Sequence, residues 1–229
     1  KGMVLITKAI KKIMPGFPLW LPSLSRPVRI KKNEVPDADI VYFPTCITRL
    51  MGGDQSDQKT LPEVIKSLCD KAGLRVFIPG NSTGVCCGQL FSSKGFQPAY
   101  SETINATITL LWHQTKQGTV PVVVDVTSCT HSLLQAFPYL DEVNKKYYGQ
   151  LKFIDSIEFA SDYLLPQLQI RRKKANVAFH PVCTVYKMNL LQQLKAIGNA
   201  CAVQADIPFL SGCCGMAGDR GFYYPGLTH

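Results

Sequence analysis

The chain has 229 residues, of which 46% are hydrophobic and 18% charged, and this length suits one large or two small globular domains. No apolar run reaches the length of a membrane-spanning helix. Lysines interrupt the apolar residues near the start, so no secretory signal is visible. The net charge is +9, but no zinc finger, helix-turn-helix or aromatic–basic RNA motif accompanies it. We therefore expect no nucleic-acid partner and interpret the basic run Arg171–Lys174 as a solvated turn.

Nine cysteines in a chain of this length indicate metal or redox chemistry rather than a secreted disulfide scaffold. The count is odd, and adjacent cysteines such as Cys86 and Cys87 cannot readily bridge to each other. We therefore expect a reducing, cytoplasmic compartment, where clustered cysteines usually serve metal or redox sites. The chain starts at Lys1 and stops after His229, so we also expect it to be a piece of a longer protein.

Residues 1–37 are predicted to form a docking helix followed by an extended arm. Apolar residues recur with helical spacing from Met3 to Ile13, with lysines between them, and the prolines from Pro15 onward prevent a continuous helix. Trp20 and the neighbouring leucines are expected to pack onto the domain that follows. The alternative is a helix that lies on a membrane surface, which would give the protein a peripheral contact with the inner membrane.

Residues 38–170 are predicted to be the first of two repeats that alternate strands and helices. The expected strands are short and apolar, and they are Ile40–Phe43, Arg75–Ile78, Val120–Val126 and the pair Phe153 and Ile154. The expected helices are Leu61–Ala72, Ser101–Gln117, one that opens at Ser132–Phe137, and Ser156–Leu165. The helix Leu61–Ala72 is expected to bury one face and to end at the glycine that follows it.

Residues 171–229 are predicted to be a second, truncated repeat. Its expected elements are a strand at Val177–Phe179, a helix at Val185–Ile197 and a strand at Ala202–Gln204. Alternating strands and helices predict an α/β fold with parallel sheets. The predicted fold is thus two Rossmann-like repeats related by pseudo-two-fold symmetry.

A cysteine pattern that occurs twice is the main functional signal. In the first copy a predicted strand leads to Pro44-Thr45-Cys46, and after 39 further residues comes Cys86-Cys87-Gly88. In the second copy a predicted strand leads to Pro181-Val182-Cys183, and after 29 further residues comes Cys213-Cys214-Gly215. The duplication predicts two soft-metal or redox sites.

The cysteines of the first copy are expected to meet at one edge of the sheet, together with Cys129. Each follows a predicted strand, and functional loops gather at the carboxyl ends of parallel strands. We expect the Cys-Cys-Gly segment at a loop-to-helix junction, where backbone N–H groups favour thiolates. Adjacent cysteines point in different directions, which favours an iron–sulfur cluster over a single zinc ion. The second copy lacks a partner equivalent to Cys129, which by the spacing of the first copy would fall beyond His229.

The remaining cysteines and two histidines are interpreted as structural. Cys69 and Cys201 have no counterpart in the other repeat and lie on or beside apolar elements, as buried free cysteines do. His131 lies close to Cys129 and could add a ligand, but we favour a residue at a helix start. His180 is interpreted as a packed or hydrogen-bonded residue.

The cysteine pattern resembles the CCG (cysteine-rich) domain. This domain occurs in the cysteine-rich component of heterodisulfide reductase, in the iron–sulfur component of anaerobic glycerol-3-phosphate dehydrogenase, and in lactate-utilisation and glycolate-oxidase iron–sulfur proteins. The family's repeat has five cysteines, and Cys46, Cys86, Cys87 and Cys129 match the first four. Ser132 stands at the fifth position, so the resemblance implies a four-thiolate cluster such as 4Fe–4S, or a replaced metal, rather than a five-thiolate noncubane cluster. The ligands that the pattern and the resemblance together imply are Cys46, Cys86, Cys87, Cys129, Cys183, Cys213 and Cys214.

The end of the chain is similar to the C-terminal part of large FAD-linked oxidases. This similarity lies in residues 211–222, and the segment Leu19–Pro22 also looks like the stretch after a ferredoxin segment in those proteins. The resemblance implies an iron–sulfur electron-transfer domain of an FAD-dependent D-lactate or 2-hydroxyacid dehydrogenase, which would pass electrons from flavin to a quinone or another acceptor. Its implied partners are the FAD-binding and ferredoxin-like domains of the same chain. FAD would belong to the parent protein, so the fragment alone is not expected to catalyse.

Two alternatives stay open. The first is a structural module of the same oxidoreductase, which holds zinc or no metal. The second is a thiol–disulfide reductase module, with Cys86-Cys87 or Cys213-Cys214 at the reactive site.

Overall fold

The computed structural model describes residues 2–17, 27–28, 30, 33, 35, 37–51, 59–80, 84–208, 212–216 and 220–227. The expected packing of Trp20 and the segment Leu19–Pro22 lie outside these residues, as does part of the segment 211–222. Among the helices of the described residues, none is both long and apolar enough to cross a membrane.

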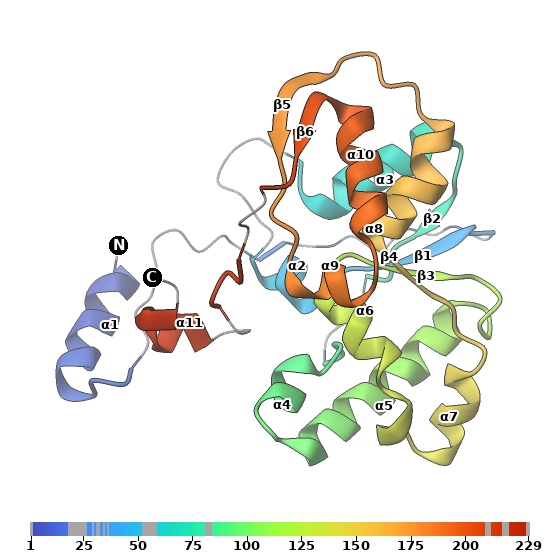
Figure 1. Cartoon of the computed structure of the whole chain (residues 1–229). Helices are drawn as coiled ribbons and strands as arrows, with labels where there is room; N and C mark the ends of the chain where they lie inside the picture. The colour runs from blue at the N-terminus through green and yellow to red at the C-terminus, as the bar shows by residue number, and fades with distance from the viewer. Residues whose placement is uncertain are drawn as a thin grey trace.

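A four-stranded parallel sheet forms the centre of the molecule (Figure 1). Its strands are β1 (Ile40–Phe43), β2 (Val76–Phe77), β3 (Val122–Val124) and β4 (Phe153–Asp155). They lie in the order β2-β1-β3-β4, and every neighbouring pair is parallel. The predicted parallel α/β sheet is confirmed, although β2 and β3 are shorter than the sequence pattern indicated.

Helices cover both faces of this sheet, because neighbouring side chains along a strand point to opposite sides. Phe43, Val122 and Val124 pack on one side, against α5 (Gln97–Gln114), α6 (Thr127–Leu134) and α7 (Glu142–Tyr148). Tyr42, Val123 and Ile154 pack on the other side. That side is covered by α3 (Leu61–Ala72), α8 (Ser156–Glu158) and the π-helix Phe159–Leu164, as Figure 1 shows. Both faces of the sheet are therefore buried, as parallel sheets require.

Helix α3 has the predicted bounds because its end signals are explicit. The side chain of Glu63 accepts a hydrogen bond from the backbone N–H of Thr60 at 2.8 Å, which completes a capping box. Gly73 ends the helix in the left-handed region with φ of 73°. Its predicted apolar face is only partly correct, because Ile65 and Cys69 are buried whereas Leu61 and Val64 are exposed.

The predicted bounds of two helices were wrong. Helix α5 begins before Ser101 and ends at Gln114, because the chain then turns through Lys116 and Gln117 with φ of 51° and 62°. Helix α6 does not open at Ser132 but starts at Thr127, which puts Cys129 in its first turn. Helix α7 was not predicted, and the side chain of Asp141 caps it by accepting the N–H of Asn144 at 2.8 Å.

The second predicted repeat forms a separate, smaller sheet. Strands β5 (Lys174–Ala178) and β6 (Ala202–Asp206) are parallel and largely exposed, in contrast to the first sheet. The helix expected at 185–197 is two helices, α9 (Cys183–Lys187) and α10 (Leu191–Cys201), because Asn189 adopts a φ of 56° between them. With four strands in one sheet and two in the other, pseudo-two-fold symmetry is not confirmed.

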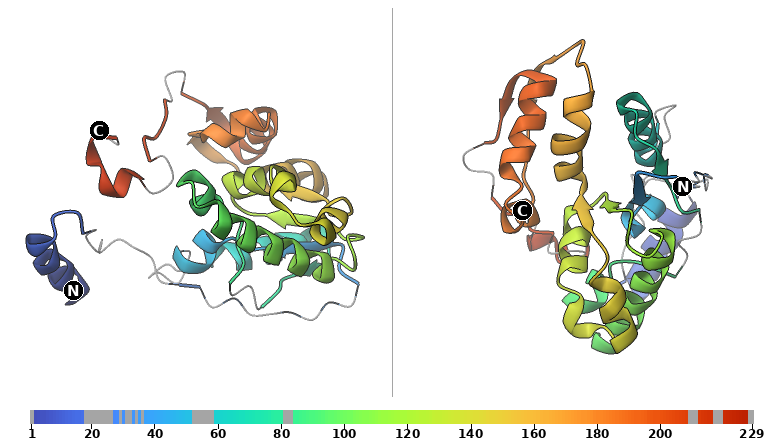
Figure 2. Two further views of the ribbon diagram at one scale, coloured as in Figure 1. Left: turned by 90° about the horizontal axis from the view of Figure 1, so that it is seen from below. Right: turned by 90° about the vertical axis from the view of Figure 1, so that its right-hand side faces the viewer.

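Helix α1 (Gly2–Ile13) confirms the predicted N-terminal helix, and it stands away from the sheets in Figure 1 and in the left view of Figure 2. Short α-helices and turns complete the described residues. They are α2 (Cys46–Met51), α4 (Gln89–Ser93), α11 (Arg220–Tyr223) and the 3-10 turns Phe137–Tyr139, Leu165–Gln167 and Pro225–Leu227.

Candidate thiolate site

The four cysteines of the first repeat gather at the point where the sheet topology reverses. Strand β1 has β2 on one side and β3 on the other. The chain first adds a strand on one side of β1 and then continues on the other side, so the strand order reverses at β1. In open parallel sheets, the carboxyl ends of two such strands form a natural binding crevice. Cys46 opens α2 after β1, and Cys129 lies in the first turn of α6 after β3. The dipeptide Cys86-Cys87 reaches the same place from β2, just before α4.

The four free cysteines influence one another chiefly as two pairs. Cys46 pairs with Cys86, and this outer pair is half-buried. Cys87 pairs with Cys129, and this inner pair is only 5% and 4% exposed, within the core on the α5 side of the sheet. The prediction that residues from three distant loops converge is therefore correct.

Each pair consists of one sulfur that favours the thiolate and one that favours the thiol. The pKa of Cys86 is lowered to about 6, chiefly because Cys46 donates a hydrogen bond to it. The backbone N–H of Gly88, 3.3 Å from Cys86 Sγ, adds to this effect. The pKa of Cys87 is lowered mainly by the hydrogen bond from Cys129 and further by the N–H of Gln89. The same hydrogen bonds, together with burial, raise the pKa of Cys46 and of Cys129.

The Cys-Cys-Gly loop is fixed by side chains from α5 and α6. Thr107 Oγ1 accepts the N–H of Cys86 at 3.1 Å and donates to its carbonyl at 2.9 Å. Gly88 caps α4 in the left-handed region with φ of 69°, and a Cβ there would lie 2.6 Å from the ring of Tyr100. The expected loop-to-helix junction is thus confirmed, and no other residue fits at Gly88.

Ser132, which stands where the family pattern has a fifth cysteine, has a different role here. Its hydroxyl donates a 2.9 Å hydrogen bond to the carbonyl of Cys87, and the side chain is buried. This residue therefore holds the Cys-Cys loop, and the site contains four thiols.

Arg49 joins the two loops that carry the outer pair, and sequence reasoning missed it. Its Nη2 donates to the carbonyl of Val85 at 2.6 Å, and its Nε donates to that of Thr45 at 3.4 Å. Its positive charge favours thiolates at Cys46 and Cys86. The signal in the sequence was a basic residue one helical turn after Cys46.

Two acidic side chains at the ends of β3 and β4 hydrogen-bond to the elements that carry Cys46 and Cys129. Asp125 accepts the hydroxyl of Tyr42 at 2.6 Å and the N–H of Thr45 at 3.1 Å, which fixes the turn before Cys46. Asp155 is fully buried and accepts the hydroxyl of Thr130 on α6 at 2.7 Å. Burial raises the pKa of Asp155 and, with the charge of Asp125, that of Tyr42. Asp125 directly follows β3 and Asp155 is the last residue of β4, so an acid at the end of an apolar run is the signal in the sequence.

The donor chemistry of the site fits an iron–sulfur group. Within the described residues, no group of three or more His, Cys, Asp and Glu side chains is arranged to hold a metal ion. The donor set nevertheless consists entirely of soft sulfur ligands. In addition, the hydroxyl of Thr45, next to Cys46, is buried and makes no hydrogen bond. This hydroxyl is a donor that a cluster sulfur would satisfy.

The second copy of the motif is arranged differently. Cys183 opens α9, which packs against α6, and its side chain is exposed. Cys213 and Cys214 are exposed as well. None of the three belongs to a group of possible metal ligands among the residues that the structure describes, so their role as ligands stays a prediction.

The other candidates of the sequence analysis lie outside the site. Cys69 is fully buried on the α3 side of the sheet, the face opposite the inner pair, as expected for a structural cysteine. Cys201 is half-buried at the end of α10. His131 lies half-buried on α6, and His180 is exposed.

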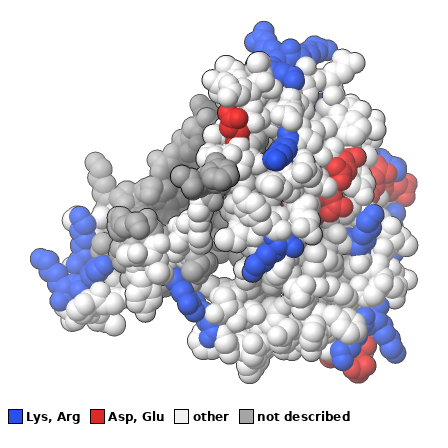
Figure 3. Space-filling model, in the orientation of Figure 1, with Lys and Arg blue, Asp and Glu red and all other residues white. Residues whose placement is uncertain are grey.

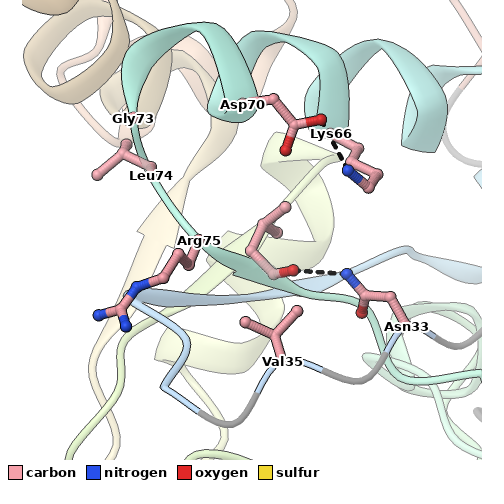
Figure 4. A pocket seen from close by; sticks show the side chains of 8 residues that line it. Asn33, Val35, Lys66, Asp70, Gly73, Leu74 and Arg75 are labelled. Carbon is pink, nitrogen blue, oxygen red and sulfur yellow. Dashed lines mark hydrogen bonds and ion pairs between the residues drawn. The ribbon is translucent and has the colours of Figure 1, made fainter.

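An open hollow of about 500 Å³ lies at the opposite edge of the sheet (Figure 4). It is lined by residues at the end of α3 and the start of β2, and by the arm residue Asn33, which donates to the carbonyl of Val76 at 2.7 Å. The hollow contains none of the cysteines, so it is not part of the thiolate site.

Comparison with known families identifies the cysteine-bearing region. Residues 40–133 match the family model of the cysteine-rich domain, CCG. No curated protein and no solved structure matched the chain. The matched region contains all four thiols of the site, and its family indicates a role in metal or iron–sulfur redox chemistry.

Proposed function

Because residues 40–133 are a CCG cysteine-rich domain, we propose that Cys46, Cys86, Cys87 and Cys129 bind an iron–sulfur cluster that carries electrons. The observation that carries this proposal is the meeting of four free thiols, from three loops, at the switch point of a parallel sheet. When bound, such a cluster supplies reversible one-electron chemistry at potentials tuned by its surroundings.

The residues of the chain would tune that chemistry in three ways. The N–H groups of Gly88 and Gln89 stabilise negative charge on the two adjacent sulfurs. Arg49 adds a positive charge beside the outer pair. The apolar core around the inner pair excludes water from one side of the site. The amide donors and the cation stabilise negative charge on the sulfurs, whereas burial destabilises that charge.

We further propose that this domain belongs to an FAD-linked D-lactate or 2-hydroxyacid dehydrogenase. The support is the similarity of residues 211–222 to the C-terminal part of such oxidases, together with the CCG domain itself. Electrons from the flavin would pass through a ferredoxin-like domain to this site and then to a quinone or another acceptor. The chain carries no recognised flavin motif, so FAD would bind elsewhere in the parent protein.

Metal analysis tests the proposed ligands. The chain is purified anaerobically and reconstituted with iron and sulfide, and its iron, zinc and acid-labile sulfide are compared with those of a Cys46→Ser/Cys87→Ser variant. Iron and sulfide that are present in the parent chain and lost in the variant are the expected result. The buried thiol of Cys69 offers the matched control, and Cys69→Ala should retain the iron. Zinc in place of iron, or no metal, would instead support the structural module.

Thiol–disulfide exchange is a second candidate, favoured by the hydrogen-bonded pairs of free thiols. Cys46 interacts most strongly with Cys86, and Cys87 with Cys129, so we assign the reactive pair to Cys46 and Cys86 rather than to the vicinal Cys86-Cys87. In the metal-free chain, Cys46 and Cys86 would give two electrons and two protons to oxidised glutathione. The two cysteines would then form a disulfide, and the glutathione disulfide would become two thiols. Peptide mapping identifies the bond, and a Cys86–Cys87 product would contradict this assignment.

A further inference from the structure

Helix α1 presents an apolar stripe that is largely exposed. Met3, Ile6 and Ile13 lie on one side of this helix and are 49%, 52% and 84% exposed. Met14, directly after the helix, is 57% exposed. Thr7, one helical turn after Met3, borders this stripe and is buried, and its hydroxyl donates to carbonyls of the helix itself. Ile10, in the middle of the stripe, is half-buried, so the stripe is most exposed at Ile6 and Ile13.

The opposite side of α1 is basic. Lys8, Lys11 and Lys12 are exposed, and the helix contains no acidic residue. Figure 3 shows Lys and Arg side chains gathered over α1, beside uncharged atoms and without a red patch. Helix α1 thus combines an apolar stripe with a cationic face, the pattern of helices that lie in a membrane interface.

The sequence around α1 extends this charge. The first 33 residues contain eight Lys and Arg and no Asp or Glu, so they account for eight of the nine net positive charges of the chain. The rest of the chain is therefore almost neutral. An arm that is uniformly basic suits a uniformly anionic surface, whereas docking on one acidic protein would require matched pairs.

We propose that α1 binds anionic phospholipid surfaces. The helix lies along the interface with Met3, Ile6 and Ile13 in the acyl boundary and its lysines at the head groups. One short apolar stripe alone binds a membrane weakly, and a polybasic segment supplies the second signal that makes binding stable. This inference goes beyond the proposed electron transfer and does not depend on metal at the thiolate site.

Co-sedimentation of the 229-residue chain with vesicles tests the proposal. We expect binding to mixed phosphatidylcholine–phosphatidylglycerol vesicles and none to pure phosphatidylcholine. Because each lysine near such a surface contributes about a fivefold gain in binding, Lys8→Gln/Lys11→Gln/Lys12→Gln should weaken binding roughly a hundredfold. Ile6→Ser/Ile13→Ser should also abolish stable binding, since it removes the apolar anchor.

The matched control removes the same charge elsewhere. Arg171→Gln/Arg172→Gln/Lys174→Gln changes three exposed residues before and at the start of β5 and should leave vesicle binding within a few-fold of the parent chain. Equal losses in the two charge variants would overturn the proposal, because net charge alone would then explain binding. Absence of binding to anionic vesicles would also overturn it, and would favour a protein partner for the stripe. Iron content of the same samples is the independent readout of the thiolate site.

Discussion

The two copies of the cysteine motif occupy contrasting surroundings. In the first copy, the sulfurs of Cys87 and Cys129 lie in a core on a four-stranded sheet that is covered on both faces. In the second copy, Cys183, Cys213 and Cys214 are exposed, and the two strands of that repeat, β5 and β6, are mostly exposed as well. Matching motif positions thus differ in burial.

The difference shows what a motif needs in order to become a site. The first Cys-Cys loop is held by Thr107 and Ser132, and the turn before Cys46 by Asp125. These supports come from the residue after β3 and from α5 and α6, so the sheet and its helices, rather than the motif, hold the loop in place. The spacing of cysteines identifies candidate ligands, and packing decides which of them converge.

The largest expected effect is a loss of iron, and it should differ between the same motif position in the two copies. Cys87→Ser should remove nearly all iron from the reconstituted chain, because it deletes a buried sulfur at the centre of the site. Cys214→Ser should leave most of the iron in place, because Cys214 is exposed and outside the four-thiol group. Iron and acid-labile sulfide per chain are the measurement. Full iron in Cys87→Ser would refute the ligand assignment, and equal losses would erase the contrast between the copies.

Thiol accessibility should separate the copies by at least about tenfold in rate, since buried thiols react only after local opening. In the metal-free chain under native conditions, iodoacetamide should modify Cys183, Cys213 and Cys214 quickly. Cys87 and Cys129 should react as slowly as Cys69, which is fully buried. Mass spectrometry of digests gives each rate. Equal rates at Cys87 and Cys214 would mean that the inner pair is not packed as described.

The side chains that hold the first loop should contribute measurably to stability. Ser132→Ala removes the donor to the buried carbonyl of Cys87, and Thr107→Val removes both contacts to Cys86. Each should lower the free energy of unfolding by about 1–3 kcal/mol, the usual effect of a buried polar group left without its partner. Thr119→Val is the control at an exposed threonine and should change stability by about 0.5 kcal/mol or less. Urea titrations that show no difference between these variants would contradict the assigned roles.

The smallest effect concerns Asp155 and pH. Burial raises the pKa of this carboxyl, so the folded protein holds its proton more tightly than the unfolded chain does. Its contribution therefore makes the free energy of unfolding fall as pH rises from below the ordinary carboxyl pKa through the raised one, by at most about 1.4 kcal/mol per pH unit. Asp155→Asn should remove that slope, whereas Asp162→Asn, at an exposed position, should retain it. An unchanged slope in Asp155→Asn would show that the pKa is not raised.

The sequence predicted those parts of the fold that have strong local signals. Strand β1 and helix α3 have the predicted bounds, since a compact apolar run marks the first and end-capping residues mark the second. Helix α6 started earlier than predicted because its first residues are polar, Thr127-Ser128-Cys129. Its hydroxyls are bound by Asp155, which is contributed by a strand that comes later in the chain. Such long-range hydrogen bonds leave no periodic trace in the sequence.

The ligand candidates of the first copy were also predictable, because strand ends and cysteine spacing place them at one edge of the sheet. Their pairing was not predictable. Nothing in the order Cys46, Cys86, Cys87 and Cys129 tells which thiols hydrogen-bond, since this depends on how α2 and α6 approach the Cys-Cys loop. The contributions of Arg49 and Ser132 depend on the same approach.

The most direct test of the central claim is an anaerobic redox titration of the reconstituted chain, monitored by electron paramagnetic resonance. If the four thiols of the first copy hold an electron-carrying iron–sulfur cluster, a paramagnetic signal should appear and disappear reversibly in a one-electron step. The same signal should persist in Cys214→Ser and be absent from Cys87→Ser. A chain that contains iron and sulfide but shows no reversible step, or that holds zinc instead, would contradict the account.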